Sequence, residues 1–77
     1  MQDKTGIIAI VAANVRLGRK AAGLSQEELA FEAEIDRTYV SQIERAVINP
    51  SLLILHKVAK VLGASVVDLL TPTKPQR

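Results

Sequence analysis

Residues 25–45 read SQEELAFEAEIDRTYVSQIER, and this stretch decides the fold. Ser25 and Glu28 have the spacing of a capping box, in which two side chains and two backbone amides pair at the start of a helix. Asp36 is a residue type that caps helices, so a second helix is expected from Arg37 to about position 45. The stretch therefore predicts two short helices joined by a tight turn.

The second of these helices has two chemically different sides. Successive side chains of a helix are about 100° apart, so Val40 and Ile43 point to one side and Tyr39 and Glu44 occupy opposite flanks. The remaining side holds hydrogen-bonding and basic residues, without an apolar or acidic one: Thr38, Ser41, Gln42, Arg45 and, at its margin, Arg37. An ordinary solvated face would mix both signs of charge. The pattern therefore predicts a surface that enters the major groove of DNA, where arginine recognises guanine through two hydrogen bonds.

The rest of the chain predicts three more helices, over residues 6–22, 52–62 and 66–70. The core positions expected in the first and fourth helices are Ile8, Val11, Ala12, Val15, Ala22, Leu52, Leu55, Val58, Ala59 and Leu62. No segment alternates like a strand. We expect one compact all-α domain over residues 1–70, followed by a disordered polar tail over residues 71–77.

Apolar residues outside these core positions predict association. Leu53, Ile54, Val61 and Val67 gather around the fourth and fifth helices, and we expect them to form the interface of a homodimer. A second apolar stripe follows the first helix: Ile7, Ile10 and Leu17. A domain of this size cannot easily bury both stripes of that helix, so one of them is also expected at an interface.

Composition limits the function classes. The chain has 77 residues, no cysteine, a net charge of +2 and a pI near 9.3, so bulk charge supports nucleic-acid binding only weakly. Its aromatic residues are Phe31 and Tyr39, too few for a platform that stacks single-stranded bases. No apolar run reaches the length of a membrane span, and the N-terminal apolar patch does not read as a signal peptide. We therefore expect a cytoplasmic protein without membrane attachment.

The sequence carries no signature of catalysis. His56 is the only histidine and has no second metal ligand at a suitable spacing. Glu28 and Glu32 are one helical turn apart, but there is neither a nucleophile nor a glycine-rich phosphate loop to work with them. We expect no enzymatic activity, no metal and no cofactor.

The motifs SQEELA, IDRTYVSQIER, NPSL and VAKVLG, in this order and spacing, resemble the XRE (lambda/434 repressor-like) helix-turn-helix family. The similarity covers residues 15–70, and the run DRTYVSQIER is most similar to the controller proteins of restriction–modification systems. The resemblance implies a five-helix domain whose third helix reads the major groove.

The resemblance also implies roles for single residues. Arg37, Thr38, Ser41 and Gln42 fall at base-contacting positions, Gln26 and Arg45 at phosphate-contacting positions, and Arg19 and Glu44 at a buried salt bridge. Tyr39 approaches DNA in controller-like members; alternatively it packs beside Val40 and Ile43. The sequence departs from the family at Glu34 and Ala46, where glycine is usual, and at Gly18, where leucine is usual.

Together these features predict a homodimeric transcription regulator that reads a pseudo-palindromic operator in double-stranded DNA, with recognition helices about 34 Å apart. An activator of this kind, bound upstream of a promoter, would touch RNA polymerase. The alternative is a protein-interaction module, such as an antitoxin or adaptor, that holds a protein partner through the second stripe of the first helix and the tail.

Overall fold

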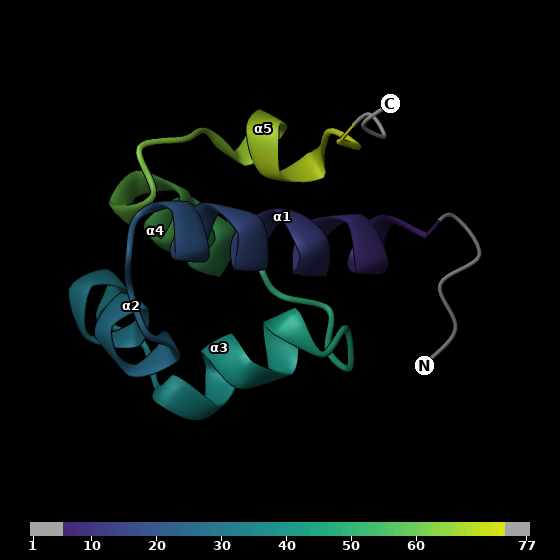
Figure 1. The fold of residues 1–77 in the computed structure, drawn as a ribbon. Coiled ribbons are helices and arrows are strands. Elements are labelled where there is room, and N and C mark those ends of the chain that lie inside the picture. Colours follow the sequence, from purple (N-terminus) through teal and green to yellow (C-terminus); the bar gives the residue numbers. More distant parts are fainter. Residues whose placement is uncertain (1–5, 74–77) are drawn as a thin grey trace.

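The computed structural model describes residues 6–73, and in this range the chain forms five α-helices and no strand (Figure 1). The helices are α1 Ile7–Ala21, α2 Gln26–Ala33, α3 Arg37–Glu44, α4 Leu52–Val61 and α5 Val66–Leu70. The bounds of α1, α3, α4 and α5 lie within one residue of the ranges expected from the sequence. None of the helices in the described range is long and apolar enough to span a membrane.

Side-chain caps start four of the helices. The Ser25 hydroxyl accepts from the Glu28 amide at 3.0 Å, and the Glu28 carboxylate accepts from the Ser25 amide at 2.8 Å. Ser65 and Asp68 form the same reciprocal pair before α5. Asp36 and Ser51 each accept one backbone amide at the start of α3 and α4. The boundaries of these short helices are therefore fixed locally, because otherwise unpaired amides find a partner.

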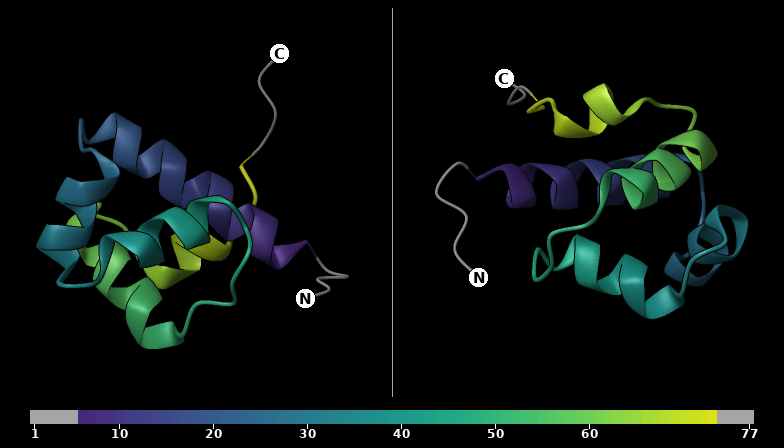
Figure 2. Two further views of the ribbon diagram at one scale, coloured as in Figure 1. Left: turned by 90° about the horizontal axis from the view of Figure 1, so that it is seen from below. Right: turned by 180° about the vertical axis from the view of Figure 1, so that it is seen from behind.

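Helix α1 runs through the middle of the molecule, with α3 on one side and α5 on the other (Figures 1 and 2). Helix α2 packs against α3 and α4, which completes a single core. The largest side chains that are fully enclosed in this core are Leu29, Ile43, Val15, Val40 and Val58. Ala30 and Ala33 are also buried, as expected for two helices that cross closely at a short turn.

Two expected core residues lie at the surface instead. Ala22 is exposed because α1 ends one residue earlier and Ala22 forms its C-terminal cap. Leu52 is 73% exposed because it is the first residue of α4, and that part of the first turn does not face the core. The core stripe of α4 therefore begins at Leu55.

Packing against α4 explains why a glycine occupies position 18. A Cβ atom placed on Gly18 would lie 3.0 Å from Cδ1 of Leu62, so α1 approaches the end of α4 closely at this point. Leu62 fills the space that a large side chain on α1 would otherwise take. A leucine at position 18 would collide with Leu62, which explains why the apolar stripe of α1 is interrupted there.

Among residues 6–73, two residues that are not glycine adopt the left-handed backbone conformation: Glu34 with φ 59° and Ala46 with φ 60°. Glu34 ends α2 inside the turn that leads to α3, and Ala46 follows the C-terminal end of α3. Both ends of α3 are thus bounded by a backbone conformation that favours glycine.

Asn14 connects α1 with the end of α5. Its amide nitrogen donates to the carbonyl oxygens of Leu69 at 2.9 Å and Thr71 at 2.8 Å, and its carbonyl oxygen accepts from the Thr73 hydroxyl at 2.8 Å. Thr71 and Thr73, in the first part of the expected tail, are therefore hydrogen-bonded to α1. The rest of that tail, residues 74–77, lies outside the described residues.

Candidate nucleic-acid interface

Helix α3 lies at one edge of the molecule, with one side against the core and the other toward solvent (Figure 1). Val40 is 0% exposed and Ile43 is 1% exposed, so these two residues fix the inner side. The Asp36 carboxylate accepts from the amide of Thr38 at 2.8 Å and fixes the start of the helix. The orientation of α3 therefore follows from its apolar residues and its cap, as the sequence predicted.

The solvent side of α3 holds all the residues expected to contact bases except Tyr39, which lies on its flank. Arg37 and Thr38 are exposed in the first turn, and Ser41 and Gln42 are half-buried in the second. Arg45 is exposed at the C-terminal cap, where its Nε donates to the Ser41 hydroxyl at 3.3 Å. This side offers amide, hydroxyl and guanidinium groups, which are the groups that pair with base edges and phosphates.

The two acids that flank α3 differ in their exposure. The Glu44 side chain is 0% exposed and is paired with Arg19. Asp36 is exposed, and its carboxylate caps the start of the helix and keeps its charge. The buried and paired Glu44 therefore adds no free negative charge at the C-terminal end of the helix.

Glu44 is held in an ion pair between α3 and α1. Its two carboxylate oxygens accept from Arg19 at 2.6 Å (Nε) and 3.0 Å (Nη2), which confirms the pair implied by the resemblance. Burial alone would raise the pKa of Glu44, but the hydrogen bonds from Arg19 and Gln26 and the positive charges nearby outweigh it and lower that pKa. The hydrogen bond to Glu44 in turn raises the pKa of Arg19. The pair stays charged and ties the end of α3 to α1.

Gln26 also reaches Glu44. Its side-chain nitrogen donates to Oε1 of Glu44 at 3.0 Å, which places the start of α2 beside the end of α3. Arg16 comes near the same oxygen, with its Nε 3.7 Å away. Sequence reasoning did not single out Arg16; the available signal was that it precedes Arg19 by one turn on the same side of a helix.

Tyr39 is half-buried and packs against the core cluster, on the flank of α3. Packing against the core accounts for the partial burial of Tyr39. Contact of Tyr39 with DNA stays a prediction. The base and phosphate contacts of the other site residues likewise stay predictions.

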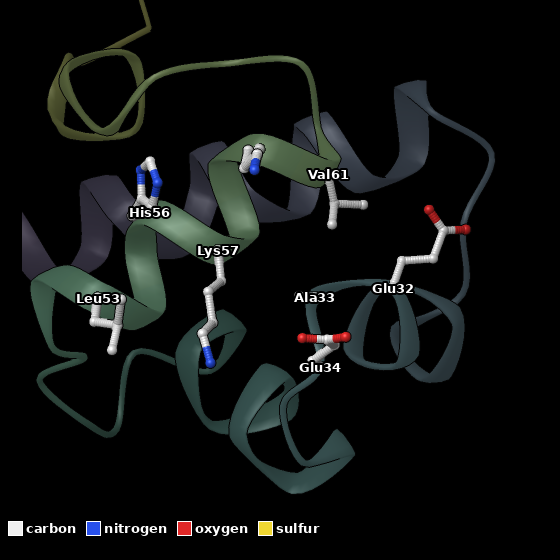
Figure 3. A pocket seen from close by; sticks show the side chains of 8 residues that line it. Glu32, Ala33, Glu34, Leu53, His56, Lys57 and Val61 are labelled. Atoms are coloured by element: carbon white, nitrogen blue, oxygen red, sulfur yellow. The ribbon is translucent and has the colours of Figure 1, made fainter.

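A groove lies on another face, between α2 and α4 (Figure 3). Glu32 and Glu34 line its α2 side, while His56 and Lys57 project from α4. In the described range, residues 6–73, no group of three or more His, Cys, Asp or Glu side chains could hold a metal ion. His56 is an exposed residue of this groove and lies apart from the basic side of α3.

Comparison with known proteins agrees with this geometry. The helix-turn-helix family model HTH_3 matches residues 15–69. A hypothetical transcription factor from Neisseria meningitidis is 43% identical over 72 residues, which cover 94% of this chain and 68% of that protein. The crystal structure of the Neisseria factor superimposes with a TM-score of 0.85 and covers 94% of this chain and 83% of the solved chain.

Two further solved structures are similar. The restriction–modification controller protein C.AhdI from Aeromonas hydrophila has a TM-score of 0.77 at 39% identity, covering 80% of this chain and 94% of that chain. SinR of Bacillus subtilis, solved in complex with DNA, has a TM-score of 0.76 at 40% identity, covering 79% and 98%. These matches extend over most of the described helices, including the basic side of α3. The chain therefore belongs to the XRE-type helix-turn-helix family of transcription regulators.

Proposed function

We propose that the protein is a sequence-specific transcription regulator that binds double-stranded DNA as a homodimer and reads a pseudo-palindromic operator through α3. One observation carries the proposal. The solvent side of α3 presents Arg37, Thr38 and Gln42, while its inner side is buried in the core and Glu44 is buried in an ion pair with Arg19. A relative of the same fold was solved with DNA, which supports DNA as the partner.

Different residues would carry specificity and affinity. Arg37 lies at the start of α3, the end of a recognition helix that approaches base edges in this class of protein. A guanidinium there can hold guanine O6 and N7 together, whereas Thr38, Ser41 and Gln42 each offer a weaker polar contact. Gln26 and Arg45 would bind phosphates at either side, which fixes the register without reading sequence.

The dimer surface is best placed on α4 and α5. Leu53 is 62% exposed and Val67 is 70% exposed, and Leu53 lines the groove of Figure 3 with Val61. Ile54 and Val61 are half-buried against the core of the same chain. Leu53 and Val67 therefore have the larger apolar surface to bury against a second copy, with Ile54 and Val61 at the edge of that contact.

Selection of bound duplexes from a randomised pool tests the proposal. The expected product is a two-fold symmetric sequence whose half-sites are about one helical turn apart, bound more tightly than a scrambled duplex at equal salt. A pool with no enriched sequence, together with equal affinity for every duplex, would contradict sequence-specific recognition. Regulation would follow from occupancy: the bound dimer covers a promoter element or, upstream of it, meets RNA polymerase.

Two exposed apolar residues favour a second candidate, a protein-interaction module. Phe31 is 82% exposed on α2, and Leu17 is 55% exposed on α1. Exposed aromatic and aliphatic residues of this size are typical of contacts with a protein partner. Replacing both with serine separates the candidates, because a DNA-binding regulator would keep its affinity for the selected duplex. If a folded double variant loses duplex binding, Phe31 and Leu17 are not independent of DNA binding, and the test cannot assign them to a protein partner.

A further inference from the structure

The buried Glu44 carboxylate gathers polar side chains from two other helices at one point. Its Oε1 accepts from Gln26 of α2 at 3.0 Å and from Arg19 of α1 at 3.0 Å, and it lies 3.7 Å from Nε of Arg16. Arg16 and Gln26 therefore meet at the same carboxylate oxygen, although one belongs to α1 and the other to α2. A single acid thus brings together two groups that can donate hydrogen bonds.

The charges at this point do not cancel. Arg19 makes two hydrogen bonds to Glu44 and neutralises it, and its side chain is 12% exposed. Arg16 adds a second positive charge to the same carboxylate, with a side chain that is 57% exposed. Of the acids in the first turn of α2, Glu28 is bound to the Ser25 amide and Glu27 points to solvent. The positive charge of Arg16 therefore exceeds what neutralises Glu44, and it is accessible to solvent.

The Arg16 guanidinium is accessible from solvent. Its Nε lies 3.7 Å from Oε1 of Glu44, and the side chain is 57% exposed, so its N–H groups can reach a ligand. Paired N–H groups of this kind match the oxygens of a phosphate. We propose that Arg16 is a further DNA-contacting residue, which binds a backbone phosphate beside Gln26 and is positioned by Glu44. This inference rests on the proposed function.

The salt dependence of duplex binding tests it. Fluorescence anisotropy would give the Kd of the unsubstituted protein, Arg16→Ala, Arg16→Lys and Lys60→Ala for a selected duplex and a scrambled duplex of equal length, over a range of KCl concentrations. Lys60 is the matched control, because it is an exposed cation in the last turn of α4 and lines the groove between α2 and α4 instead of the basic side of α3. Loss of one phosphate contact reduces the slope of log K against log salt by about 0.9.

Arg16→Ala is expected to reduce this slope by about 0.9 on both duplexes alike, because a phosphate contact carries no sequence information. Arg16→Lys should restore the slope, since it keeps the charge, and Lys60→Ala should leave it unchanged. Thermal unfolding checks that the Arg19–Glu44 pair still holds the fold, and Arg16→Gln serves as a second neutral variant.

The inference is overturned if a folded Arg16→Ala or Arg16→Gln protein keeps the slope of the unsubstituted protein. It is also overturned if Lys60→Ala reduces the slope as much, since that would be a general effect of charge. If the unsubstituted protein binds the selected duplex and the neutral Arg16 variants keep its salt slope, the proposed function stands and the Arg16 contact is rejected. If it binds no duplex, the proposed function fails and the inference fails with it.

Discussion

Arg37 has the chemistry and the position of a base-reading residue. It is exposed at the start of α3, and no acid in the described structure competes for it as an ion-pair partner. Arg37→Ala should weaken binding of the selected operator by about 1–3 kcal/mol and relax the preference at one base pair of each half-site. Selection from a randomised pool with the variant checks this. An equal loss of affinity on every sequence would instead assign Arg37 to a phosphate.

The two left-handed residues at the ends of α3 are sites of backbone strain. Replacing Glu34 or Ala46 with glycine removes a steric conflict between Cβ and the backbone, so each change should raise the free energy of unfolding by about 1 kcal/mol. Urea unfolding of the single variants measures the effect. Ala22→Gly is the control: Ala22 has φ −82°, and glycine there should lower stability by about 0.5–1 kcal/mol. A destabilised Ala46→Gly protein would show that Ala46 is not strained.

At the scale of single residues, the features predicted best from the sequence are those that depend only on residues nearby in the chain. The caps at Ser25 and Asp36 need only residues a few positions away, and both formed as expected. Gly18 could not be explained in this way, because its reason is Leu62, which lies far along the chain. The link from Asn14 to the segment after α5 was missed for the same reason.

At the scale of elements, α3 is positioned by the ion pair that joins it to α1. Glu44→Gln keeps the shape of the side chain but leaves Arg19, which is 12% exposed, without its counter-charge. We expect this change to lower the free energy of unfolding at pH 7 by about 3 kcal/mol. Urea unfolding measures the loss, and Glu32→Gln, at an exposed position on α2, should change stability little.

The stability that is lost in Glu44→Gln should depend on pH. The pKa of Glu44 is lower in the folded protein than the value of about 4.3 expected in the unfolded chain. Its ionised form therefore stabilises the fold above that value, and this stabilisation is lost as the pH falls through the lowered pKa. The gap in stability between the unsubstituted protein and Glu44→Gln should be full at pH 7 and smaller below about pH 4. A gap that is unchanged in acid would contradict the role given to the ionised pair.

Helical periodicity predicted which side of each helix faces inward, except near helix ends. Val40 and Ile43 were placed correctly because their helix is short and its cap fixes the starting point. Leu52 and Ala22 were misplaced because an end residue is covered only if another element lies over it. Periodicity gives the direction in which a side chain points, but it does not show whether another helix covers that side chain.

At the scale of the whole molecule, the proposed dimer surface makes a sharp prediction. Leu53→Asp should leave the fold intact, because Leu53 is 62% exposed, and should shift the protein from dimer to monomer. Sedimentation velocity measures the change, and duplex affinity should fall with it, since two linked half-site contacts become one. Leu17→Asp tests the competing apolar stripe of α1, where the side chain is 55% exposed, and it should leave the dimer intact if α4 and α5 form the interface. An intact Leu53→Asp dimer would count against this surface.

The fold could be predicted from sequence because side chains cap four of the helices in the described range and the apolar residues of α1, α3 and α4 recur at helical spacing. The assembly could not, because exposed apolar residues occur on several faces, including Phe31, Leu17 and Val67. A sequence shows that these residues are apolar, and a single folded chain shows that they are uncovered. Neither identifies which of them meets a second copy.

The central claim is that the solvent side of α3 lies against duplex DNA. Titration of ¹⁵N-labelled protein with a selected duplex, followed by amide chemical shifts, tests this most directly. The predicted result is that the largest shifts gather at residues 37–42 and at Gln26, with few in α4 and α5. Shifts centred on α4 and α5, or no shifts at low salt, would contradict it.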